Sequence, residues 1–598
     1  MEDKTETTIE TSSVGRKVSR RDFLVGAALA GVGTAMAGAI TGCASPAPKD
    51  TSANKTAPEA NAAAGGAEST ASGQPAFLTA PDPIPDSEIV ETVDCDIVIC
   101  GAGICGLPAA MLAAENGAKV HVLEKGSSYG IARLCTAGFN SGLQTKLNLT
   151  TDREEFITST WAISNGVQGR MSSYGLWFDN SGPYIDWLES VFNEKGYQLI
   201  PAASLKDYKI TNDGIDMPGA SPLWQAFAQM IFFADSEGKF FATGGKVDWT
   251  GIMEEYATEK GATFHYSTPA VQLVLDDSGR CTGVIAKNES EEYIKYNAAK
   301  GVLLTTGDMA ADREMMEHYN VTLGKIIRYN INTNDTGDGQ KMGIWIGADM
   351  DEFACGDLWP FAAVMMDGTL PTTFDGTHFY AGVANLPMLM VDGAGRRLMA
   401  ENLPFQSPSI PKLTCTPDGC AWTIWDSAWE SKVPQGGYMV EDYTASNTQE
   451  EVDKNVANGV TFKFDTIEEL GKHCGFDKDI FAASFKRYND LCAGGKDLDF
   501  YKDPLWMTAI DTPPFYASKH CSSMTSTRGG LKNDERCRVL DKKGLPIPGL
   551  YAAGNTAGSF YGNVYPPNVM GSGIGHGQCF AWLAVKDILG MDFIHANI

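Results

Sequence analysis

The sequence predicts an α/β protein built around a Rossmann-like domain, for three reasons. Residues 95–123 follow the order strand, glycine-rich turn, helix and strand, which is that of a βαβ unit. The chain has 598 residues, more than a single hydrophobic core organises, so we expect two or more domains. Hydrophobic residues make up 43% and charged residues 20% of the chain, which excludes wholesale disorder and a fibrous protein.

The net charge and the spacing of the cysteines exclude several classes of function. Lys and Arg number 47 against 74 Asp and Glu, a formal charge of −27, and such an acidic surface repels phosphate backbones. Nucleic acid is therefore not an expected partner. The 14 cysteines contain no C-x-x-C spacing, so we expect no zinc ribbon, no thioredoxin-type pair, no covalent haem and no metal site.

The N-terminus, residues 1–42, predicts a twin-arginine export signal. Arg20 and Arg21 stand directly before a weakly apolar run, residues 23–40. Small residues then lead to Cys43, which resembles a bacterial lipoprotein processing site. We expect an extracytoplasmic lipoprotein held at the cell membrane through Cys43. The alternatives are a short membrane anchor or a buried helix, although four glycines make the run a poor helix former.

Residues 43–88 predict a disordered tether. The stretch from Ala44 to Ala76 has no Val, Ile, Leu, Met, Phe, Trp, Tyr or Cys, so it cannot bury a core. We expect the folded part to begin near Ile89, and we find no further transmembrane stretch after it.

The glycine-rich turn predicts a nucleotide site. Gly101, Gly103 and Gly106 follow a short apolar strand and open a helical pattern, and Glu124 ends the next strand. The first glycine permits a tight turn, the second lets the backbone approach a pyrophosphate, and the third lets helix and strand pack closely. The helix N-terminus offers N–H donors to the anion, and Glu124 accepts hydrogen bonds from ribose hydroxyls. This fingerprint alone does not choose between NAD and FAD.

A second segment, far away in the sequence, distinguishes between these two cofactors. Residues 547–555, I-P-G-L-Y-A-A-G-N, resemble the GLYAAG strand of the FAD-dependent fumarate reductase and 3-ketosteroid dehydrogenase superfamily. The resemblance covers roughly Asp94 to Leu589. Further matches are V-L-L-T-T-G at 302–307, T-G-D-G at 336–339, G-R-R-L-M-A-E at 395–401 and T-R-G-G-L at 527–531.

The resemblance implies non-covalent FAD and a two-domain architecture. It places the FAD-binding domain at residues 89–330 and 510–598, with an α+β cap domain, residues 331–509, inserted between them. The active site would lie in the cleft between the two, against the flavin. The residues that it assigns to the cofactor are Gly101, Gly103, Gly106, Glu124, Lys125, Thr136, Gly138, Val271, Thr306, Gly307, Asp338, Asn555, Gly571 and Ile574.

The positions that hold fumarate in dicarboxylate-reducing relatives carry other residue types here. Those relatives use histidines and arginines, because a dianion in a dry pocket needs cationic partners. This chain has L-W-P at 358–360, S-T-R at 526–528, no arginine at 568–572, and Trp429 and Glu430 where a proton-donating arginine is expected. We therefore do not expect fumarate as the substrate.

The C-terminal motifs are more similar to the ketosteroid branch. There, the tyrosine of a Tyr-Pro or Tyr-Ala pair and a backbone N–H bind a substrate carbonyl, which implies Tyr565 with Gly571 or Gly573 here. The turn at 566–571 is longer than in that branch, so the substrate itself is not carried over. The alternative for Tyr565 is packing on the flavin rim. The residues that we expect to contact substrate are Trp359, Ala400, Tyr561, Asn568 and Arg528.

Arg397 and Glu401 match the arginine and the acid of the family's cap domain. In the fumarate enzymes the acid contributes to a proton relay, so the resemblance implies a catalytic role. The next arginine of that relay is Pro404 here, so the relay is broken or rerouted. The alternative is that Glu401 is only an ion-pair partner of Arg397.

The cysteines carry no further prediction of a cofactor. Cys95, Cys100 and Cys105 straddle the first strand and its turn, so they cannot converge on one iron–sulfur cluster, and we interpret them as small buried residues. Cys415 and Cys420 flank a turn sequence and are candidates for a disulfide.

Together these patterns predict an exported FAD-dependent reductase of a C=C bond conjugated to a carbonyl. No second Rossmann fingerprint and no haem motif is visible, so electrons come from an external donor such as a cytochrome or a membrane quinol system. The first alternative is a 3-ketosteroid-type dehydrogenase that passes electrons to an external acceptor. The weaker alternative is a flavin electron-transfer lipoprotein.

Overall fold

A computed structural model describes most of the chain after the predicted signal. The residues that it describes are 74–130, 135–163, 169–203, 210–212, 215–217, 229–236, 249–326, 329–330, 333–369, 383, 386–402, 409–432, 448–562, 565 and 571–595. The export signal, Cys43 and Asn568 lie outside these ranges. Among the helices that are described, none has the length and apolarity that a membrane span requires.

The folded body begins before the predicted boundary at Ile89. Phe77, in the short helix η1 (Ala76–Leu78), is buried at 5% exposure. Glu314 accepts a hydrogen bond from the backbone N–H of Ala76 at 2.8 Å, and the indole of Trp345 donates to the carbonyl of Phe77 at 2.8 Å. The prediction that the tether extends to residue 88 is therefore wrong at its end. A second short helix, η2 (Asp86–Glu88), leads into the first strand.

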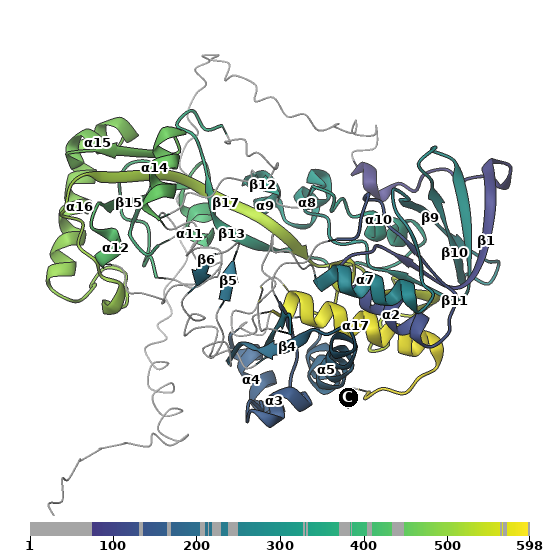
Figure 1. The fold of residues 1–598 in the computed structure, drawn as a ribbon. Helices are drawn as coiled ribbons and strands as arrows, with labels where there is room; N and C mark the ends of the chain where they lie inside the picture. The colour runs from purple at the N-terminus through teal and green to yellow at the C-terminus, as the bar shows by residue number, and fades with distance from the viewer. Residues whose placement is uncertain are drawn as a thin grey trace, which may run out of the picture. The chain divides into compact units, whose positions relative to one another are not determined.

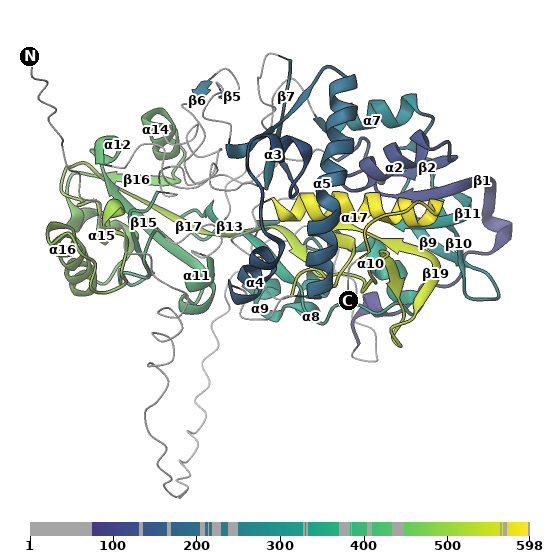
Figure 2. The same ribbon diagram turned by 90° about the horizontal axis from the view of Figure 1, so that it is seen from below.

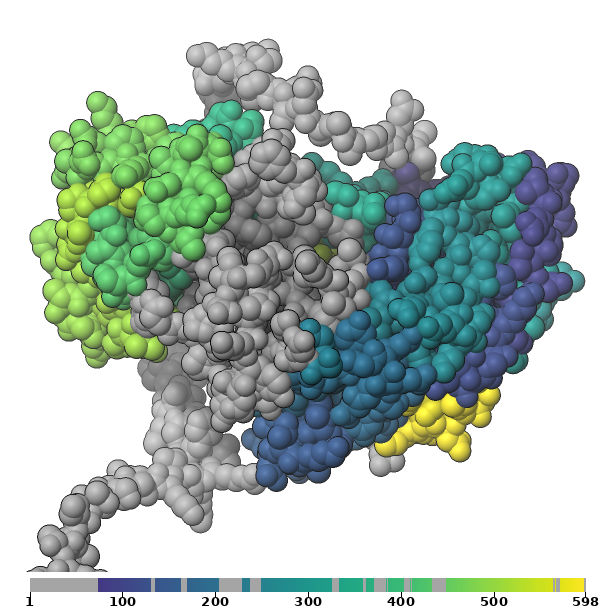
Figure 3. All heavy atoms as spheres, in the orientation of Figure 1, coloured from purple at the N-terminus to yellow at the C-terminus, as the bar shows by residue number. Residues whose placement is uncertain are grey.

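The first sheet has eight strands in the order β18-β19-β11-β1-β2-β8, with β10 beside β11 and β9 beside β10. Strand β1 is parallel to β11 and β2, while β9, β10 and β18 pair antiparallel. Its strands are β1 (Ile89–Cys100), β2 (Val120–Leu123), β8 (Thr263–His265), β9 (Ala270–Leu275), β10 (Cys281–Lys287), β11 (Tyr293–Leu304), β18 (Arg538–Leu540) and β19 (Pro546–Ala552). In the space-filling view, purple β1 borders the teal of β9–β11, which come much later in the chain (Figure 3).

This sheet confirms the α/β prediction. Ile97, Val98, Ile99 and Cys100 at the end of β1 are fully buried, as expected for a parallel strand covered on both faces. Helix α2 follows the glycine-rich turn and packs against α7 and α17 (Figures 1 and 2). The helices of this part are α2 (Gly106–Glu115), α3 (Gly142–Lys146), α4 (Arg153–Ile163), α5 (Met171–Glu194), α7 (Trp249–Glu259), α8 (Arg313–Tyr319), α9 (Val321–Ile326), α10 (Asp338–Trp345), α17 (Ser572–Leu589) and the short η6 (Gly554–Thr556).

The second sheet has six strands in the order β12-β17-β15-β14, with β13 and β16 also paired to β17. Its strands are β12 (Tyr329–Asn330), β13 (Cys355–Ala363), β14 (Leu389–Val391), β15 (Cys420–Asp426), β16 (Thr461–Phe464) and β17 (Phe515–Arg528). The helices of the same part of the chain are α11 (Ser409–Cys415), α12 (Trp429–Lys432), α14 (Gln449–Ala457), α15 (Ile467–Cys474), α16 (Lys478–Ala493) and the short η5 (Pro504–Trp506).

Strand β17 does not respect the predicted domain boundary at residue 510. Its 14 residues pair with four other strands of the second sheet, and its last residue, Arg528, lies against Gly573 at the start of α17 (Figure 1). The predicted boundary therefore places the longest strand of the second sheet in the second FAD-binding segment, and the division of the chain into domains stays a prediction.

Two small sheets complete the fold. One contains β3 (Cys135–Ala137), β7 (Met230–Ala234) and β4 (Gln198–Pro201), and the other contains β5 (Ile210–Asn212) and β6 (Ile215–Met217). The three-stranded sheet places β3 beside α17, so the predicted cofactor residues Thr136 and Gly138 lie next to that helix.

Candidate active site

The glycine-rich turn has the geometry that a bound pyrophosphate requires. Gly101 has a φ of +105°, and a Cβ there would overlap the carbonyl of Thr305, so only glycine fits. A Cβ at Gly106 would overlap the carbonyl of Gly101, which reflects the close packing of strand and helix. Gly103 has no atom within 4 Å of such a Cβ, so its backbone borders open space at the N-terminus of α2. A phosphate fits this cradle, and a side chain would fill it.

Glu124 is held at the end of β2 in the position that ribose recognition requires. Its carboxylate accepts the backbone N–H of Ala102 at 2.8 Å and that of Gly126 at 2.7 Å. Each carboxylate oxygen keeps capacity to accept a further hydrogen bond. The two backbone bonds fix the carboxylate beside the cradle, so Glu124 fits the predicted role toward the adenosine ribose.

Several of the other predicted cofactor residues meet at the start of α10. Lys125 donates to Asp338 at 2.8 Å and to Thr336 at 2.8 Å. The hydroxyl of Thr306 accepts the backbone N–H of Gly339 at 3.0 Å. Residues that the sequence places far apart therefore form one polar surface, as expected for residues that share a ligand.

The remaining predicted cofactor residues surround the N-terminal half of α17. Thr136 is fully buried and donates to Gln578 at 2.6 Å, which leaves the amide nitrogen of Gln578 buried without a partner. Such an orphaned donor fits a site that takes another polar ligand. Gly571 caps α17 with a φ of +79°, and Ile574 lies in its first turn. Further away in sequence, Gly138 follows β3, and half-buried Val271 belongs to β9.

Arg528 is a buried cation beside two stacked tyrosine rings. It is 6% exposed, its guanidinium lies 5.4 Å from the ring centroids of both Tyr561 and Tyr565, and it donates to Asp357 at 2.8 Å. It also donates to the side-chain oxygen of Asn555. The Nε–H of Arg528 is buried and has no hydrogen-bond partner among the residues that the structure describes. This cluster therefore offers one unused donor from a positively charged group.

The two tyrosines stack at the N-terminus of α17. Their rings lie 5.6 Å apart at an interplanar angle of 17°. The backbone N–H of Gly573 donates to the hydroxyl of Tyr565 at 3.3 Å, and the hydroxyl of Tyr561 donates to Ser572 at 3.0 Å. Burial raises the pKa of Tyr565, so the phenol stays protonated at neutral pH and keeps a proton to donate. The sequence predicted that the Tyr565 hydroxyl and a backbone N–H of Gly571 or Gly573 bind one substrate carbonyl. The structure places the Gly573 N–H beside that hydroxyl, and their role toward a substrate stays a prediction.

Asp357 is the member of this cluster that the sequence did not single out. It lies on β13, two residues before Trp359, and its partner in the register of β17 is Ser526. The available signal was an acidic residue beside the segment where relatives place a substrate-binding histidine. The side chain of Trp359 itself lies outside the described part of the structure.

Arg397 and Glu401 belong to a separate buried ionic cluster. Arg397 pairs with Glu401 at 2.9 Å and with Asp497 at 2.7 Å, and Lys502 approaches Glu401 at 3.2 Å. The side chains of Glu401, Asp497 and Lys502 are fully buried. The Arg397–Glu401 ion pair, which the sequence offered as the alternative to a catalytic role, is therefore present. The cluster also contains Asp497 and Lys502, which the sequence did not predict. The described contacts of Glu401 do not bring it to Tyr565, so its catalytic role stays a prediction, as does substrate contact by its neighbour Ala400.

The cysteine predictions have mixed outcomes. Cys95, Cys100 and Cys105 are buried, as expected. Cys415 is exposed while Cys420 is buried at the start of β15, and the structure does not join them in a disulfide. Within the described ranges, no cluster of three or more His, Cys, Asp or Glu side chains is placed to hold a metal ion.

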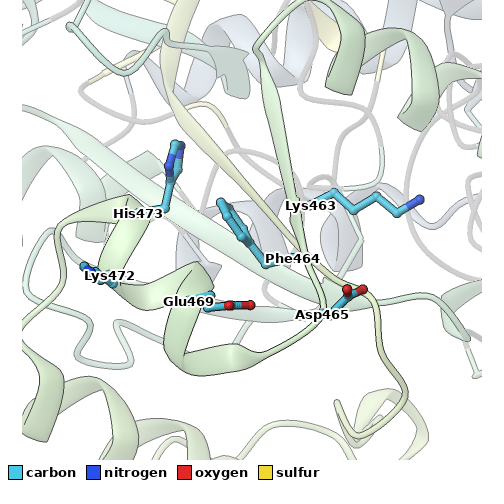
Figure 4. A pocket seen from close by; sticks show the side chains of 6 residues that line it. All are labelled: Lys463, Phe464, Asp465, Glu469, Lys472 and His473. Carbon is cyan, nitrogen blue, oxygen red and sulfur yellow. The ribbon is translucent and has the colours of Figure 1, made fainter.

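An open hollow of about 580 Å³ lies between β16 and α15, away from all predicted site residues. Figure 4 shows the six side chains around it. They are Lys463, Phe464, Asp465, Glu469, Lys472 and His473. We assign no ligand to this hollow, because it is open to solvent and is lined by both cationic and anionic side chains.

Comparisons with known proteins agree with this geometry. The family described as FAD binding domain matches residues 96–569. Vinyl phenol reductase of Lactiplantibacillus plantarum is 26% identical over 503 residues, which are 80% of this chain and 93% of that protein. A 3-oxosteroid 1-dehydrogenase of Comamonas testosteroni is 28% identical over 372 residues, 58% of this chain and 61% of that protein. The open conformation of a flavocytochrome c3 fumarate reductase has a TM-score of 0.60 at 23% identity, covering 84% of this chain and 80% of that one.

Proposed function

Because the chain belongs to the FAD binding domain family, we propose that it is an FAD-dependent oxidoreductase that reduces a C=C bond conjugated to a carbonyl group. The observation that carries this proposal is the buried cluster at the N-terminus of α17, where the Tyr565 hydroxyl, the Gly573 N–H and the Arg528 guanidinium lie together. The similarity to a vinyl phenol reductase and to a 3-oxosteroid 1-dehydrogenase supports this class of reaction.

The protein's part in the reaction is to stabilise negative charge on the substrate oxygen. When bound in its reduced form, FAD would supply the hydride for the β carbon, and the enolate left on the substrate would then take a proton at its α carbon. The Tyr565 hydroxyl donates a hydrogen bond to the carbonyl oxygen. The backbone N–H of Gly573, which donates to the Tyr565 hydroxyl in this structure, donates to the same carbonyl oxygen when substrate is bound. Charge develops on that oxygen only as the reaction proceeds, so fixed donors there lower the barrier. The N-terminus of the 18-residue helix α17 contributes in the same sense.

Arg528 adds a positive charge without forming a clamp for two carboxylates. Its guanidinium lies 5.4 Å from the centroids of both tyrosine rings and forms an ion pair with Asp357. In the described part of this cluster, Arg528 is the single cation, and a dianion would lose its hydration with little to offset the loss. The cluster therefore favours neutral or singly charged substrates over fumarate.

Electron supply and location complete the proposal. We propose that an external donor, a cytochrome or a quinol system, reduces the flavin, and that the protein is exported and tethered through a lipidated Cys43. The twin arginine at 20–21 and the small residues before Cys43 support this location. The tether would hold the enzyme close to membrane electron carriers.

A 3-ketosteroid-type dehydrogenase is the second candidate, since a donor pair that stabilises an enolate serves both directions of the reaction. The similarity to a 3-oxosteroid 1-dehydrogenase favours it. It predicts that a saturated ketosteroid bleaches the oxidised flavin, whereas the reductase predicts that an unsaturated compound reoxidises the reduced flavin.

The test is anaerobic reoxidation of dithionite-reduced holoenzyme by cyclohexenone, vinylphenol, a Δ4-ketosteroid and fumarate. We expect at least one of the two enones, cyclohexenone or the Δ4-ketosteroid, to reoxidise the flavin more than about tenfold faster than fumarate, a difference of about 1.4 kcal/mol in barrier. Reoxidation by fumarate as fast as by the best of these compounds would contradict the substrate class. A protein with stoichiometric FAD that reacts with none of them, in either direction, would support the electron-transfer alternative.

A further inference from the structure

Asp357 is a carboxylate to which the proposed mechanism gives no role, although it contacts the Arg528 guanidinium. It lies on β13, where Cys355 is the register partner of Arg528 on β17. The carboxylate of Asp357 accepts a hydrogen bond from Nη2 of Arg528 at 2.8 Å, and the side chains of Arg528 and Asp357 are 7% and 15% exposed. The hydroxyl of Thr525 donates to the backbone carbonyl of Asp357 at 2.7 Å. The pairing of the two strands therefore holds the carboxylate against the guanidinium.

The guanidinium nitrogen that Asp357 binds also borders the position proposed for the substrate oxygen. A Cβ added at Gly573 would lie 2.5 Å from Nη2 of Arg528, so a residue with a side chain would prevent this close approach. The N–H of Gly573 is one of the two donors proposed for the substrate oxygen, and in this structure it donates to the hydroxyl of Tyr565 at 3.3 Å. Asp357 and a bound substrate oxygen would therefore be neighbours of the same nitrogen.

The described contacts of Arg528 leave little positive charge for a second anion. Asp357 carries one negative charge against the one positive charge of Arg528, and Asn555 and Tyr565, which also contact the guanidinium, are uncharged. Tyr565 stays protonated because burial, and after it the charge of Asp357, raises its pKa. A further aspartate, Asp308, accepts the side-chain amide of Asn555 at 3.5 Å and adds no positive charge.

A neutral carbonyl and a carboxylate differ in what they require at this position. A ketone or ester oxygen needs only the hydroxyl and N–H donors, and it gives up little hydration on binding. A carboxylate loses the hydration of a full charge and meets the charge of Asp357 on the other side of one nitrogen. Like charges at short distance in a dry site make binding less favourable. Asp357 thus occupies the place on the guanidinium that a substrate carboxylate would need.

We propose that Asp357 is a specificity-determining residue: by neutralising Arg528, it restricts the enzyme to uncharged conjugated ketones, aldehydes and esters and excludes α,β-unsaturated carboxylates. This inference rests on the proposed function, which leaves neutral and singly charged substrates both open. Removal of the charge at residue 357 should then open the site to a carboxylate, which binds Arg528 in place of Asp357.

Binding without turnover tests this role on the oxidised, FAD-loaded full chain. The probes are cyclohexanecarboxylate, which is ionised at about pH 7.5, and its uncharged methyl ester, neither of which has a C=C bond to reduce. Titrations are followed by the visible spectrum of the flavin and by the midpoint of thermal unfolding. We expect the wild-type protein to bind the ester at least about tenfold more tightly than the carboxylate. Wild-type binding of the carboxylate as tightly as the ester would overturn the inference.

Asp357→Asn removes the charge and keeps an oxygen that can accept the hydrogen bond from Arg528. We expect the ratio of the two dissociation constants to move at least about tenfold in favour of the carboxylate. The carboxylate should also raise the unfolding midpoint of the variant more than that of the wild type, because an anion on Arg528 replaces the lost ion pair. An unchanged ratio would overturn the inference, and if the variant does not fold even with the carboxylate present, the wild-type comparison decides.

Two control variants separate this role from a general effect of charge. Asp349→Asn removes a carboxylate that pairs with Lys532 at 2.9 Å, and it should keep the wild-type ratio. Asp357→Asn combined with Arg528→Met should lose the gain in carboxylate binding, because the cation that binds the carboxylate is gone. A gain that appears in Asp349→Asn, or that persists without Arg528, would contradict the role of Asp357.

Reoxidation of the reduced flavin extends the test to turnover. The probes are 1-cyclohexenecarboxylate and its methyl ester, compared by the ratio of their kcat/KM values. The change of this ratio between wild type and variant cancels the different intrinsic reactivities of the two probes. We expect Asp357→Asn to shift the ratio at least about tenfold toward the carboxylate, and an unchanged ratio would refute the specificity role. Failure of every form to reduce either probe or cyclohexenone would refute the proposed function instead, and the binding ratios still decide the role of Asp357.

Discussion

Replacing Tyr565 with phenylalanine removes one hydroxyl group from the buried cluster at the start of α17 and leaves the ring in place. Tyr565 is 9% exposed, stacks on Tyr561 at 5.6 Å and lies 5.4 Å from the guanidinium of Arg528. These ring contacts do not involve the hydroxyl. We therefore expect Tyr565→Phe to fold and to bind FAD with an almost unchanged visible spectrum.

The effects on stability and on rate differ in size. The resting protein loses the 3.3 Å contact from the Gly573 N–H, which is long and contributes about 0.5–1 kcal/mol of stability. The donor lost in the transition state faces a developing charge in a dry site, where removal of one donor lowers the rate by about 10²–10³, or about 2.7–4 kcal/mol. The prediction is a large loss of rate with a small loss of stability.

The assay is stopped-flow reoxidation of the dithionite-reduced holoenzyme by the best enone of the panel. Tyr561→Phe is the matched control, because its hydroxyl donates to Ser572 at 3.0 Å and its loss should matter less. A Tyr565→Phe rate within about threefold of wild type, with Tyr561→Phe inactive, would show that the two roles are exchanged. If both variants are nearly silent, the carbonyl is held elsewhere, and the unpartnered Nε–H of Arg528 becomes the next candidate.

Four further predictions follow from the same geometry. Gly103→Val should fold but lose its yellow colour, because the side chain meets no protein atom within 4 Å and occupies the phosphate space; flavin absorbance per protein and thermal unfolding check this. Arg528→Met should destabilise by about 3–5 kcal/mol, and adding Asp357→Asn should recover most of it, in urea unfolding. Glu401→Gln should lower the free energy of unfolding by a similar amount, while the reoxidation rate per bound flavin stays within about threefold of wild type. A rate loss of about 10²-fold or more would instead support a catalytic role of Glu401 in proton transfer. Cys43→Ala should move the protein from the membrane to the soluble extracytoplasmic fraction, as fractionation and immunoblotting show.

Local signals predicted the nucleotide-binding elements closely. The strand before the glycine turn, the helix after it, the strand at 120–123 and its terminal Glu124 all occur as expected. Each of these elements is set by a pattern within a few residues: an apolar run, glycine spacing or an acid at a strand end. Tyr565 and its backbone N–H partner came from a motif and are adjacent in the structure.

The features that the sequence did not predict depend on contacts between residues that are far apart in the sequence. Asp357 meets Arg528 because β13 runs antiparallel to β17. Phe77 looks like a lone aromatic residue at the end of a polar tether, yet it is buried because Trp345 and Glu314 bind its segment. Pairings of this kind depend on register and tertiary packing, which single-chain patterns do not encode.

The most direct test of the central claim is a product measurement in a single anaerobic turnover. Fully reduced holoenzyme, with no other electron source, is mixed with an excess of cyclohexenone, and both oxidised flavin and cyclohexanone are quantified. We expect about one saturated ketone per FAD oxidised, since one two-electron reduction consumes one reduced flavin, and much slower reoxidation by fumarate under the same conditions. Flavin that stays reduced with cyclohexenone and every other enone of the panel, or that is reoxidised by fumarate to give succinate at the faster rate, would contradict this claim.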